Sequence, residues 1–359
     1  MEHFKITIFT SIIFSVILIT GCSPFNENNQ IEEIAPVIFW SIEEGEGEKF
    51  KMSTIMPPLI AEKKQIYTLE VDLIKESGKE FNLKNYRELK VGQLRIIVIN
   101  EEVARKGIKT LINTLLADPD ISQRLYLVVV SGSFNEYISN QLEQHEKIDY
   151  FFYRMLKHYE NKGEITVVNL HQFMKNLYAP LSDPVLPLFK ADNENLAYNG
   201  TAVFKEDKLV DTMTEMDEQI FQLINNHRYL KYFKVPAFSL LGGHIHSKVD
   251  VEFENNYKSV SVQVDLEGKI EDYLGEKDLT KQDELDALTQ EMESHLEKQT
   301  KQLLNKYQDK KVDPFHMGKH TLKPFERPIN DKEWINKWEQ MEINVDYNLK
   351  LSPLNHVDS

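Results

Sequence analysis

Residues 94–133 read LRIIVINEEVARKGIKTLINTLLADPDISQRLYLVVVSGS, and this segment predicts the class of the fold. Leu94–Ile99 and Leu125–Val130 are compact aliphatic runs of the kind found in buried strands. Between them, Asn100 can cap a helix, and the apolar residues of 103–116 recur at helical spacing. A strand, a helix and a second strand in this order predict a crossover connection with the two strands parallel.

The last third of the chain has a different pattern. Apolar and polar residues alternate through 249–253, 260–266 and 341–351, which is typical of strands with one face exposed to solvent. Residues 283–307 lie between the second and third of these stretches, and their apolar positions predict a long helix. A hairpin, a covering helix and a returning strand predict one α+β layer.

Two further signals divide the chain. Residues 183–187, Asp-Pro-Val-Leu-Pro, interrupt regular structure and mark a subdomain edge, while Asn199-Gly200 between apolar residues predicts a hairpin turn. We therefore expect an α+β fold of three subdomains, each a mixed or antiparallel β-sheet flanked by helices. Their expected limits are 31–190 for an N-terminal α+β domain, 191–245 for a small middle domain with a β-meander, and 246–359 for a C-terminal α+β domain.

The N-terminus has the features of a lipoprotein signal peptide, which we expect over residues 1–21. An uncharged apolar stretch leads into Ile19-Thr20-Gly21-Cys22, the pattern in which bacteria acylate the cysteine and make it the mature N-terminus. Cys22 is the only cysteine in 359 residues, which fits an extracytoplasmic protein. Residues 22–30 are polar and predict a flexible tether. A buried free cysteine or an uncleaved anchor helix is the alternative interpretation of Cys22 and its leader.

The charge balance limits the partners. Lys and Arg number 42 against 57 Asp and Glu, which gives a formal net charge of −15. Such a charge argues against nucleic acid, and against anionic lipid headgroups, as the main partner. We expect the N-terminal lipid to attach the protein to the membrane.

Motifs for catalysis are scarce. The sequence contains no G-x-S-x-G, Walker A or G-x-G-x-x-G motif, and no carboxylate pair stands out for glycoside hydrolysis. His244 and His246 could share a metal ion on one strand face, but the sequence offers no local third ligand. We therefore predict no catalytic residue, no metal site and no cofactor.

One short segment could bind a small ligand. Ser131, Gly132 and Ser133 lie between a predicted strand and a predicted helix N-terminus, where free backbone N–H groups can hold an anion or a carboxylate. The alternative is an ordinary turn with a hydroxyl N-cap. Trp334 and Trp338 share one helix face, which predicts core or interface packing rather than a platform for a sugar.

A series of features spread through most of the chain carries a resemblance to a known family. They are Cys22, Leu94-Arg95, Ala104–Ile108, Leu115–Asp120, Leu125–Val130, Gly200–Lys205, Asp207–Val210, Asp313, Gly318, Trp334 and Trp338. In number, order and spacing, these features resemble the C subunit of the spore germinant receptors, the GerAC-type lipoproteins of endospore-forming bacteria.

This resemblance implies a non-enzymatic role. Members of the family are anchored on the outer face of the inner spore membrane and act with a multi-spanning A subunit and a transporter-like B subunit. Together these subunits respond to small nutrients and start the release of ions and dipicolinate. The resemblance also implies an α+β fold in three subdomains. The alternative function is an extracytoplasmic lipoprotein that captures a nutrient for a permease, and an envelope hydrolase is a third.

Overall fold

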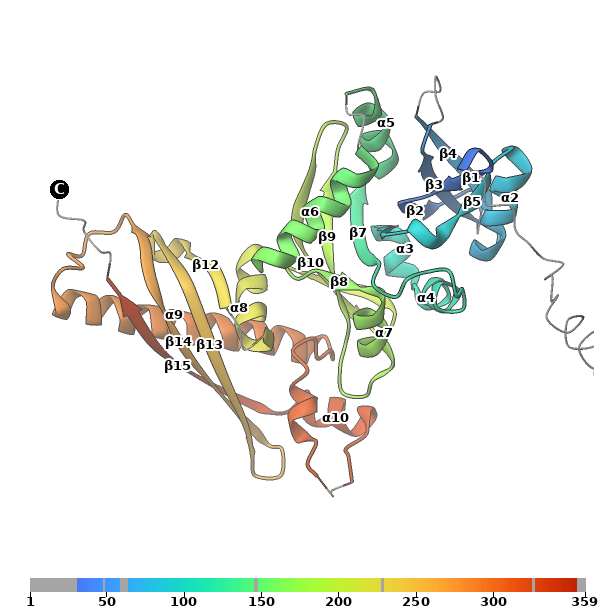
Figure 1. Ribbon diagram of the computed structural model, residues 1–359. Helices are drawn as coiled ribbons and strands as arrows, with labels where there is room; N and C mark the ends of the chain where they lie inside the picture. Colours follow the sequence, from blue (N-terminus) through green and yellow to red (C-terminus); the bar gives the residue numbers. More distant parts are fainter. Residues whose placement is uncertain are drawn as a thin grey trace, which may run out of the picture.

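The computed structural model describes residues 31–353 except 48, 59–63, 145–147, 227–228 and 325–326 (Figure 1). The expected signal peptide, the tether and Cys22 lie outside the described residues. The described residues form a two-stranded, a nine-stranded and a four-stranded sheet, each with helices beside it. The predicted α+β class with three sheet regions is therefore confirmed.

The nine-stranded sheet contains the segment that predicted the fold. Its order is β11-β10-β9-β7-β6-β2-β3-β4, with β8 paired to β7, and β2, β6, β7 and β9 run parallel. The predicted parallel pair is therefore confirmed as β6 and β7. The strands are β2 Phe39–Glu44, β3 Phe50–Met56, β4 Gln65–Val71, β6 Ile96–Asn100, β7 Tyr126–Gly132, β8 Val168–Asn169, β9 Val185–Ala191, β10 Leu196–Lys205 and β11 Lys208–Met213.

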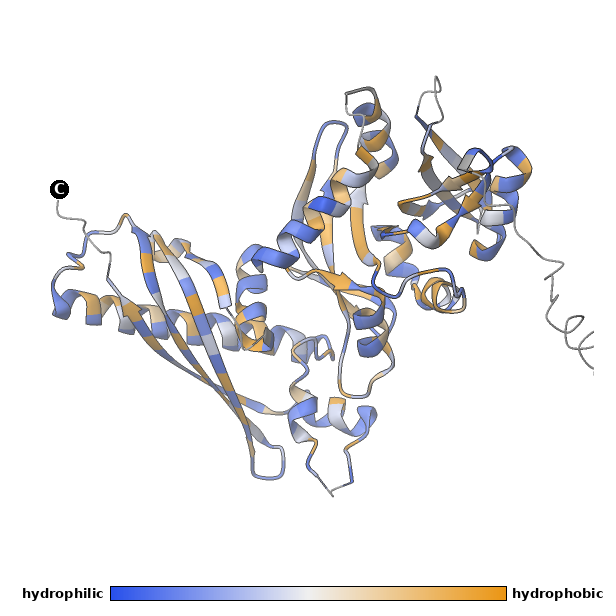
Figure 2. Ribbon diagram, in the orientation of Figure 1, coloured by the Kyte–Doolittle hydropathy of each residue, from blue (hydrophilic) through white to orange (hydrophobic). Residues whose placement is uncertain are grey.

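Helices cover both faces of this sheet, because its central strands are apolar on both sides. Side chains from α3 (Glu101–Lys106), α4 (Lys109–Leu116) and α7 (Leu170–Tyr178) pack with one set of strand residues. Side chains from α5 (Phe134–Gln144) and α6 (Ile148–Lys162) pack with the alternate set. Figure 2 shows apolar residues concentrated in these strands.

The helix predicted between β6 and β7 is interrupted. Asn100 caps α3 as expected, because its side chain accepts a hydrogen bond from the Glu102 N–H at 2.9 Å. Gly107 then has φ of 124° and separates α3 from α4. A Cβ at this position would lie 2.7 Å from Asp207 Oδ2, so the contact with the β10–β11 hairpin explains why glycine stands here.

The hairpin turn predicted at Asn199-Gly200 is wrong. Strand β10 runs through both residues, and its register with β9 shifts between Tyr198 and Gly200. Gly200 has φ of 128°, and a Cβ there would lie 2.1 Å from the Met213 carbonyl oxygen of β11. The glycine therefore serves a β-bulge and a close approach between strands.

The prediction of irregular structure over 183–187 is wrong from Val185 onward, because β9 begins at that residue. Pro187 is tolerated because pairing with β7 starts only at Leu188, beyond the proline. The expected limits at 190/191 and 245/246 fall inside β9 and β13. Strands β10 and β11, expected in a middle unit, belong to the nine-stranded sheet.

The four-stranded sheet has the order β12-β13-β14-β15, with β14 and β15 parallel and the other pairs antiparallel. Helix α9 (Gln282–Asp309) covers one face of this sheet. Apolar and polar residues alternate along the strands (Figure 2), so the apolar residues face the helix and the polar residues are exposed on the other face. The predicted hairpin, long helix and returning strand are confirmed. The strands are β12 Tyr229–Val235, β13 Leu240–Glu254, β14 Ser259–Tyr273 and β15 Glu342–Ser352.

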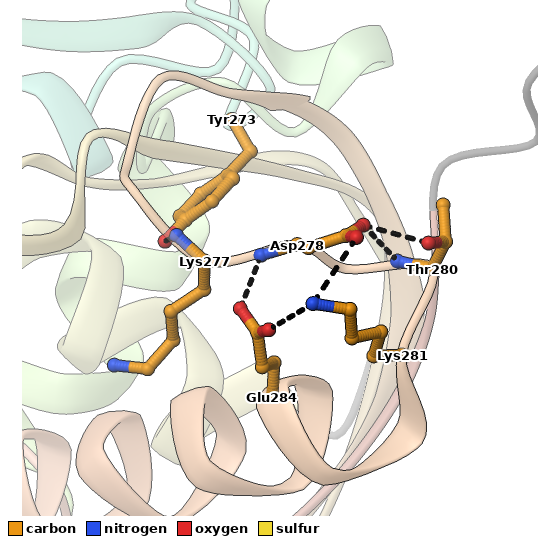
Figure 3. Close-up of polar contacts among 6 residues, drawn as sticks. All are labelled: Tyr273, Lys277, Asp278, Thr280, Lys281 and Glu284. Atoms are coloured by element: carbon orange, nitrogen blue, oxygen red, sulfur yellow. Dashed lines mark hydrogen bonds and ion pairs between the residues drawn. The ribbon is translucent and has the colours of Figure 1, made fainter.

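A polar network fixes the connection between β14 and α9 (Figure 3). Asp278 accepts hydrogen bonds from the Thr280 N–H and hydroxyl at 3.1 and 2.6 Å. Lys281 Nζ lies 2.8 Å from Glu284 Oε1 and 3.6 Å from Asp278 Oδ2. The hydrogen bonds from Thr280 are the main reason that the pKa of Asp278 is lowered. Because the network is exposed, it orders the turn more than it stabilises the fold.

Smaller elements complete the chain. The two-stranded sheet pairs β1 (Ile34–Pro36) with β5 (Glu88–Lys90), and α2 (Ser77–Lys84) follows the 3₁₀ turn η2 (Ile74–Glu76). Helix α8 (Glu215–Asn226) lies between the nine-stranded and four-stranded sheets (Figure 1), and η5 (Met317–Thr321) and α10 (Asp331–Trp338) precede β15. Across the described ranges, no helix is both long enough and apolar enough to span a bilayer.

Candidate functional site

Each of the three predicted ligand-binding residues has a structural role. Ser131 and Gly132 are the last residues of β7, and the Ser131 hydroxyl donates to the Phe189 carbonyl at 3.4 Å. Gly132 has φ of 81°, and a Cβ there would lie 2.2 Å from the Ala191 carbonyl oxygen. Ser133 Oγ accepts from the Glu136 N–H at 3.3 Å and caps α5. This geometry matches the ordinary turn with a hydroxyl cap, so ligand binding at this segment stays a prediction.

Ser133 also lines an open polar groove of about 630 Å³ beside α5. Side chains of β3, β4, α5 and the β9–β10 turn form its walls, and hydroxyl and amide groups predominate among them. Asn140 Nδ2 donates to the Asn193 carbonyl at 3.0 Å, which joins α5 to the β9–β10 turn among the lining residues. The other lining residues are Lys51, Ile66, Thr68, Asn135, Glu136 and Ser139. Groups of this kind suit a small polar molecule more than an apolar one.

His244 and His246 both lie on a strand, β13, as predicted, and both are exposed. A single tyrosine lies beside both of them. Tyr229 of β12 forms a 2.7 Å hydrogen bond with His244 Nδ1, and its ring centroid lies 5.3 Å from that of His246. His244 Nε2 also lies 3.8 Å from Glu271 Oε1. No cluster of three or more His, Cys, Asp and Glu side chains suited to a metal ion occurs within the part of the chain that the structure describes.

A buried carboxylate cluster joins distant parts of the chain. Asp313 is fully buried, and its oxygens accept from the Met317 N–H at 2.9 Å, the Gly318 N–H at 2.8 Å and Trp334 Nε1 at 3.1 Å. Its own N–H donates to Asp183 Oδ2 at 2.7 Å, and the Asp183 N–H returns a bond to the Asp313 carbonyl at 3.2 Å. The pair therefore ties the start of β9 to the loop after α9.

The electrostatics of this cluster follow from burial. Burial raises the pKa of Asp313 to about 7, although the three donors act in the opposite direction. His316, in the same loop, has its pKa lowered to about 3 by burial and by the charge of Lys319. The His316 imidazole is therefore neutral near pH 7. Because both oxygens of Asp313 accept hydrogen bonds from protein donors, the carboxylate acts as a structural acceptor.

The two tryptophans belong to this cluster. Trp334 and Trp338 are buried and stack with ring centroids 5.7 Å apart, as expected from their spacing on α10. Trp338 Nε1 donates to the Val312 carbonyl at 3.0 Å. Gly318 packs against the Trp334 ring so closely that a Cβ would lie 2.8 Å from it. The prediction of core packing for the tryptophans is confirmed.

Helix α8 makes a second polar junction. Glu218 is buried, and its Oε1 accepts from the Thr166 N–H at 2.8 Å and from Gln222 Nε2 at 3.0 Å. Burial raises the pKa of Glu218. From the same helix, Asn225 Nδ2 donates to the Pro314 carbonyl at 3.3 Å. Helix α8 is thus hydrogen-bonded to the segment that precedes β8 of the nine-stranded sheet and to the Asp313 loop.

Two protein-family models match this chain. The spore germination protein N-terminal domain matches residues 27–191, and the spore germination B3/GerAC-like C-terminal domain matches residues 199–353. The chain belongs to the GerAC family of spore germination proteins. The resemblance found in the sequence is confirmed.

Relatives in this family align with about three quarters of this chain. The spore germination protein GerQC of Bacillus cereus is 24% identical over 276 residues, which cover 75% of this chain and 77% of that protein. The putative spore germination protein YfkR of Bacillus subtilis (strain 168) is 20% identical over 288 residues, or 76% and 74% of the two chains. The crystal structure of the GerBC protein aligns with a TM-score of 0.51 at 14% identity, covering 87% of this chain and 96% of that chain. That likeness supports the fold.

The two GerAC segments are interlocked. The second segment supplies β10 and β11 to a sheet whose other strands come from the first. Asp313, Gly318, Trp334 and Trp338 stand out in the sequence as members of a series, but their contact with one another was not predicted. An acidic residue within the run Val312-Asp-Pro-Phe315 was the available signal, since a carboxylate among apolar residues needs buried donors.

Proposed function

We propose that this chain is the C subunit of a nutrient germinant receptor, attached through a lipid on Cys22 to the outer face of the inner spore membrane. In this role it acts with the multi-spanning A and B subunits and catalyses no reaction. The observation that carries the proposal is the match of both GerAC segments, which together run from residue 27 to 353. The sequence Ile19-Thr-Gly-Cys22 stands directly before them and supports the lipid anchor.

The decisive experiment measures dipicolinate release from spores that lack this chain and any redundant receptor. Spores are exposed to nutrients and, separately, to a surfactant that bypasses receptors. We expect the nutrient response to be lost while the surfactant response is retained. A normal nutrient response in these spores would refute the receptor role.

The anchor is tested separately with Cys22→Ala. We expect the variant to remain an unlipidated precursor, detected as loss of fatty-acid labelling and a slower-migrating band. Labelling equal to that of the unmodified chain would refute the assignment of Cys22. A Ser23→Ala variant, with the cysteine intact, is the matched control and should be labelled normally.

Capture of a small nutrient is the second candidate, and the polar groove lined by Ser133 favours it. Its test is equilibrium binding of amino acids and sugars to the purified protein. Micromolar binding that Asn140→Ala weakens would support capture at this groove. The absence of binding would leave the receptor proposal unaffected and would also remove Ser131–Ser133 as ligand residues.

A further inference from the structure

Large apolar side chains are exposed around α2, at the N-terminal end of the fold. Leu73, Leu83 and Tyr86 expose 59%, 70% and 73% of their surface. Phe81 and Ile74 bury the other side of the same short helical run. Leu83 is two positions beyond Phe81, about 200° around the helix, so it points away from the core. The Leu83 side chain therefore adds nothing to the core of this chain.

Charged side chains around these apolar residues differ from the rest of the protein. Lys75, Lys79 and Lys84 are exposed on or beside α2. Without the buried Arg87, residues 72–90 hold four basic and four acidic side chains, in a chain whose formal net charge is −15. This segment therefore lacks the acidic excess that repels anionic surfaces elsewhere on the protein. Leucine and tyrosine flanked by lysine is the composition that favours a membrane interface.

The chain enters the fold beside these residues. Ile34 of β1 pairs in parallel with Glu88 of β5, and the Ile34 carbonyl accepts from Arg87 Nε at 2.9 Å. Arg87 Nη1 also donates to the Pro57 carbonyl at 2.6 Å. Arg87 follows Tyr86 directly, so these bonds hold β1 next to the exposed apolar residues.

The length of the N-terminal segment limits how far this region can lie from the lipid. Eight residues separate Cys22 from Ile31, and the nine steps between these two residues span roughly 30 Å when the chain is fully extended. Figure 1 shows α2 at one end of the molecule and the connection between β14 and α9 at the other. A lipid on Cys22 therefore keeps α2 near the bilayer.

We propose that the α2 surface, formed by Leu73, Leu83 and Tyr86 with the neighbouring lysines, rests in the interfacial region of the lipid bilayer. The proposal depends on the lipid anchor at Cys22. Leucine and tyrosine side chains enter the headgroup region, while the lysine ammonium groups stay at the level of the phosphates. The tether makes this an intramolecular contact, so a surface too small to bind membranes alone is sufficient. The contact sets the orientation of the whole chain on the membrane.

The experiment uses the full-length lipidated protein in protein-free vesicles of phosphatidylcholine with a minor fraction of phosphatidylglycerol. In the acylated protein the sulfur of Cys22 is blocked, so a cysteine introduced by Leu83→Cys is the single reactive thiol. It is labelled with an environment-sensitive fluorophore. Leu274→Cys is the matched control, because Leu274 is 82% exposed in the β14–α9 connection. Tyr86→Cys is a second reporter in case the label at position 83 disturbs α2.

We expect blue-shifted emission at positions 83 and 86, with several-fold stronger quenching by spin labels near the headgroups than at position 274. Protein that floats with the vesicles while all three labels report water would overturn the α2 surface and leave the anchor intact. Protein that does not float would overturn both. Shielding of position 83 only in vesicles that also contain the A and B subunits would mean a protein partner, and would equally overturn the lipid contact.

Discussion

His316→Asn should change how the free energy of unfolding depends on pH. His316 has φ of 58°, a backbone conformation that asparagine tolerates, so the variant keeps the loop geometry. Its Nε2 is buried and has no hydrogen-bond partner among the residues that the structure describes. Burial and the Lys319 charge lower the pKa of His316 to about 3, against 6.5 in the unfolded chain.

The sign of the effect follows from proton uptake. Below pH 6.5 the unfolded chain binds a proton at His316, while the folded protein does so only near pH 3. Acidification through this range therefore favours unfolding, and stability that is complete above pH 6.5 is lost as the pH falls. At pH 5 the loss is about 2 kcal/mol, since the pH lies about 1.5 units below the unfolded pKa.

Asp313 acts with the opposite sign. Its pKa, raised to about 7 by burial, makes the folded protein bind the proton first, so stability falls as the pH rises from about 4 to 7. The two groups therefore partly cancel in the unmodified protein. Replacing His316 alone should expose the contribution of Asp313.

Urea unfolding at pH 7.5 and pH 5 measures the effect. We expect the change in unfolding free energy between these pH values to shift by about 2 kcal/mol in favour of pH 5 in His316→Asn. His246→Asn, at an exposed position on β13, is the control and should match the unmodified chain. Equal pH dependence in all three proteins would refute the argument that His316 is held neutral by its surroundings.

Two glycine substitutions test packing, and one glutamate substitution tests the protection of a sheet edge. Gly132→Ala should destabilise the fold by roughly 2–4 kcal/mol, because the residue has a positive φ and its new Cβ also collides with the facing Ala191 carbonyl. The control is Gly47→Ala, which has a positive φ but no neighbour within 4 Å and should cost only about 1 kcal/mol. Equal urea midpoints for these two would contradict the collision. Gly318→Ala should lower the free energy of unfolding by about 1–3 kcal/mol, because it overpacks the tryptophan cluster. The control, Gly78→Ala in α2, should raise it by up to about 1 kcal/mol. A stabilised Gly318→Ala would show that the cluster can expand. Glu293→Ala removes the carboxylate that accepts a hydrogen bond from the Leu349 N–H of the edge strand β15 at 2.8 Å. We expect the free energy of unfolding to fall by about 1 kcal/mol and aggregation, measured by light scattering, to become faster. Unchanged aggregation would argue against edge protection.

Local sequence patterns predicted the elements whose formation depends on local geometry. Strands β13, β14 and β15 follow the alternation of side chains, since successive residues of any strand face opposite sides. Helix α9 follows its apolar spacing, and Asn100 caps α3. These features depend on neighbours in sequence, so the sequence alone was sufficient.

The errors occur where a distant segment decides the conformation. Gly107 divides a helix because the β10–β11 hairpin passes beside it, and Gly200 forms a bulge because β11 approaches its backbone. The site shows the same limit. Ser131 and Gly132 carry the composition of a ligand loop, but their contacts are with β9, which lies more than fifty residues away. Nothing within a short window distinguishes these cases from a turn or an anion site.

Hydrogen bonds at two carboxylates join the two GerAC segments of the chain. Asp183 and Thr166 belong to the first family segment, whereas Asp313 and Glu218 belong to the second. Partly buried hydrogen bonds join Asp183 to Asp313 and Thr166 to Glu218. Breaking such a bond leaves a buried carboxylate short of a donor, which costs more than losing an apolar contact of similar size. These bonds hold α8 and the Asp313 loop against the connections of the nine-stranded sheet.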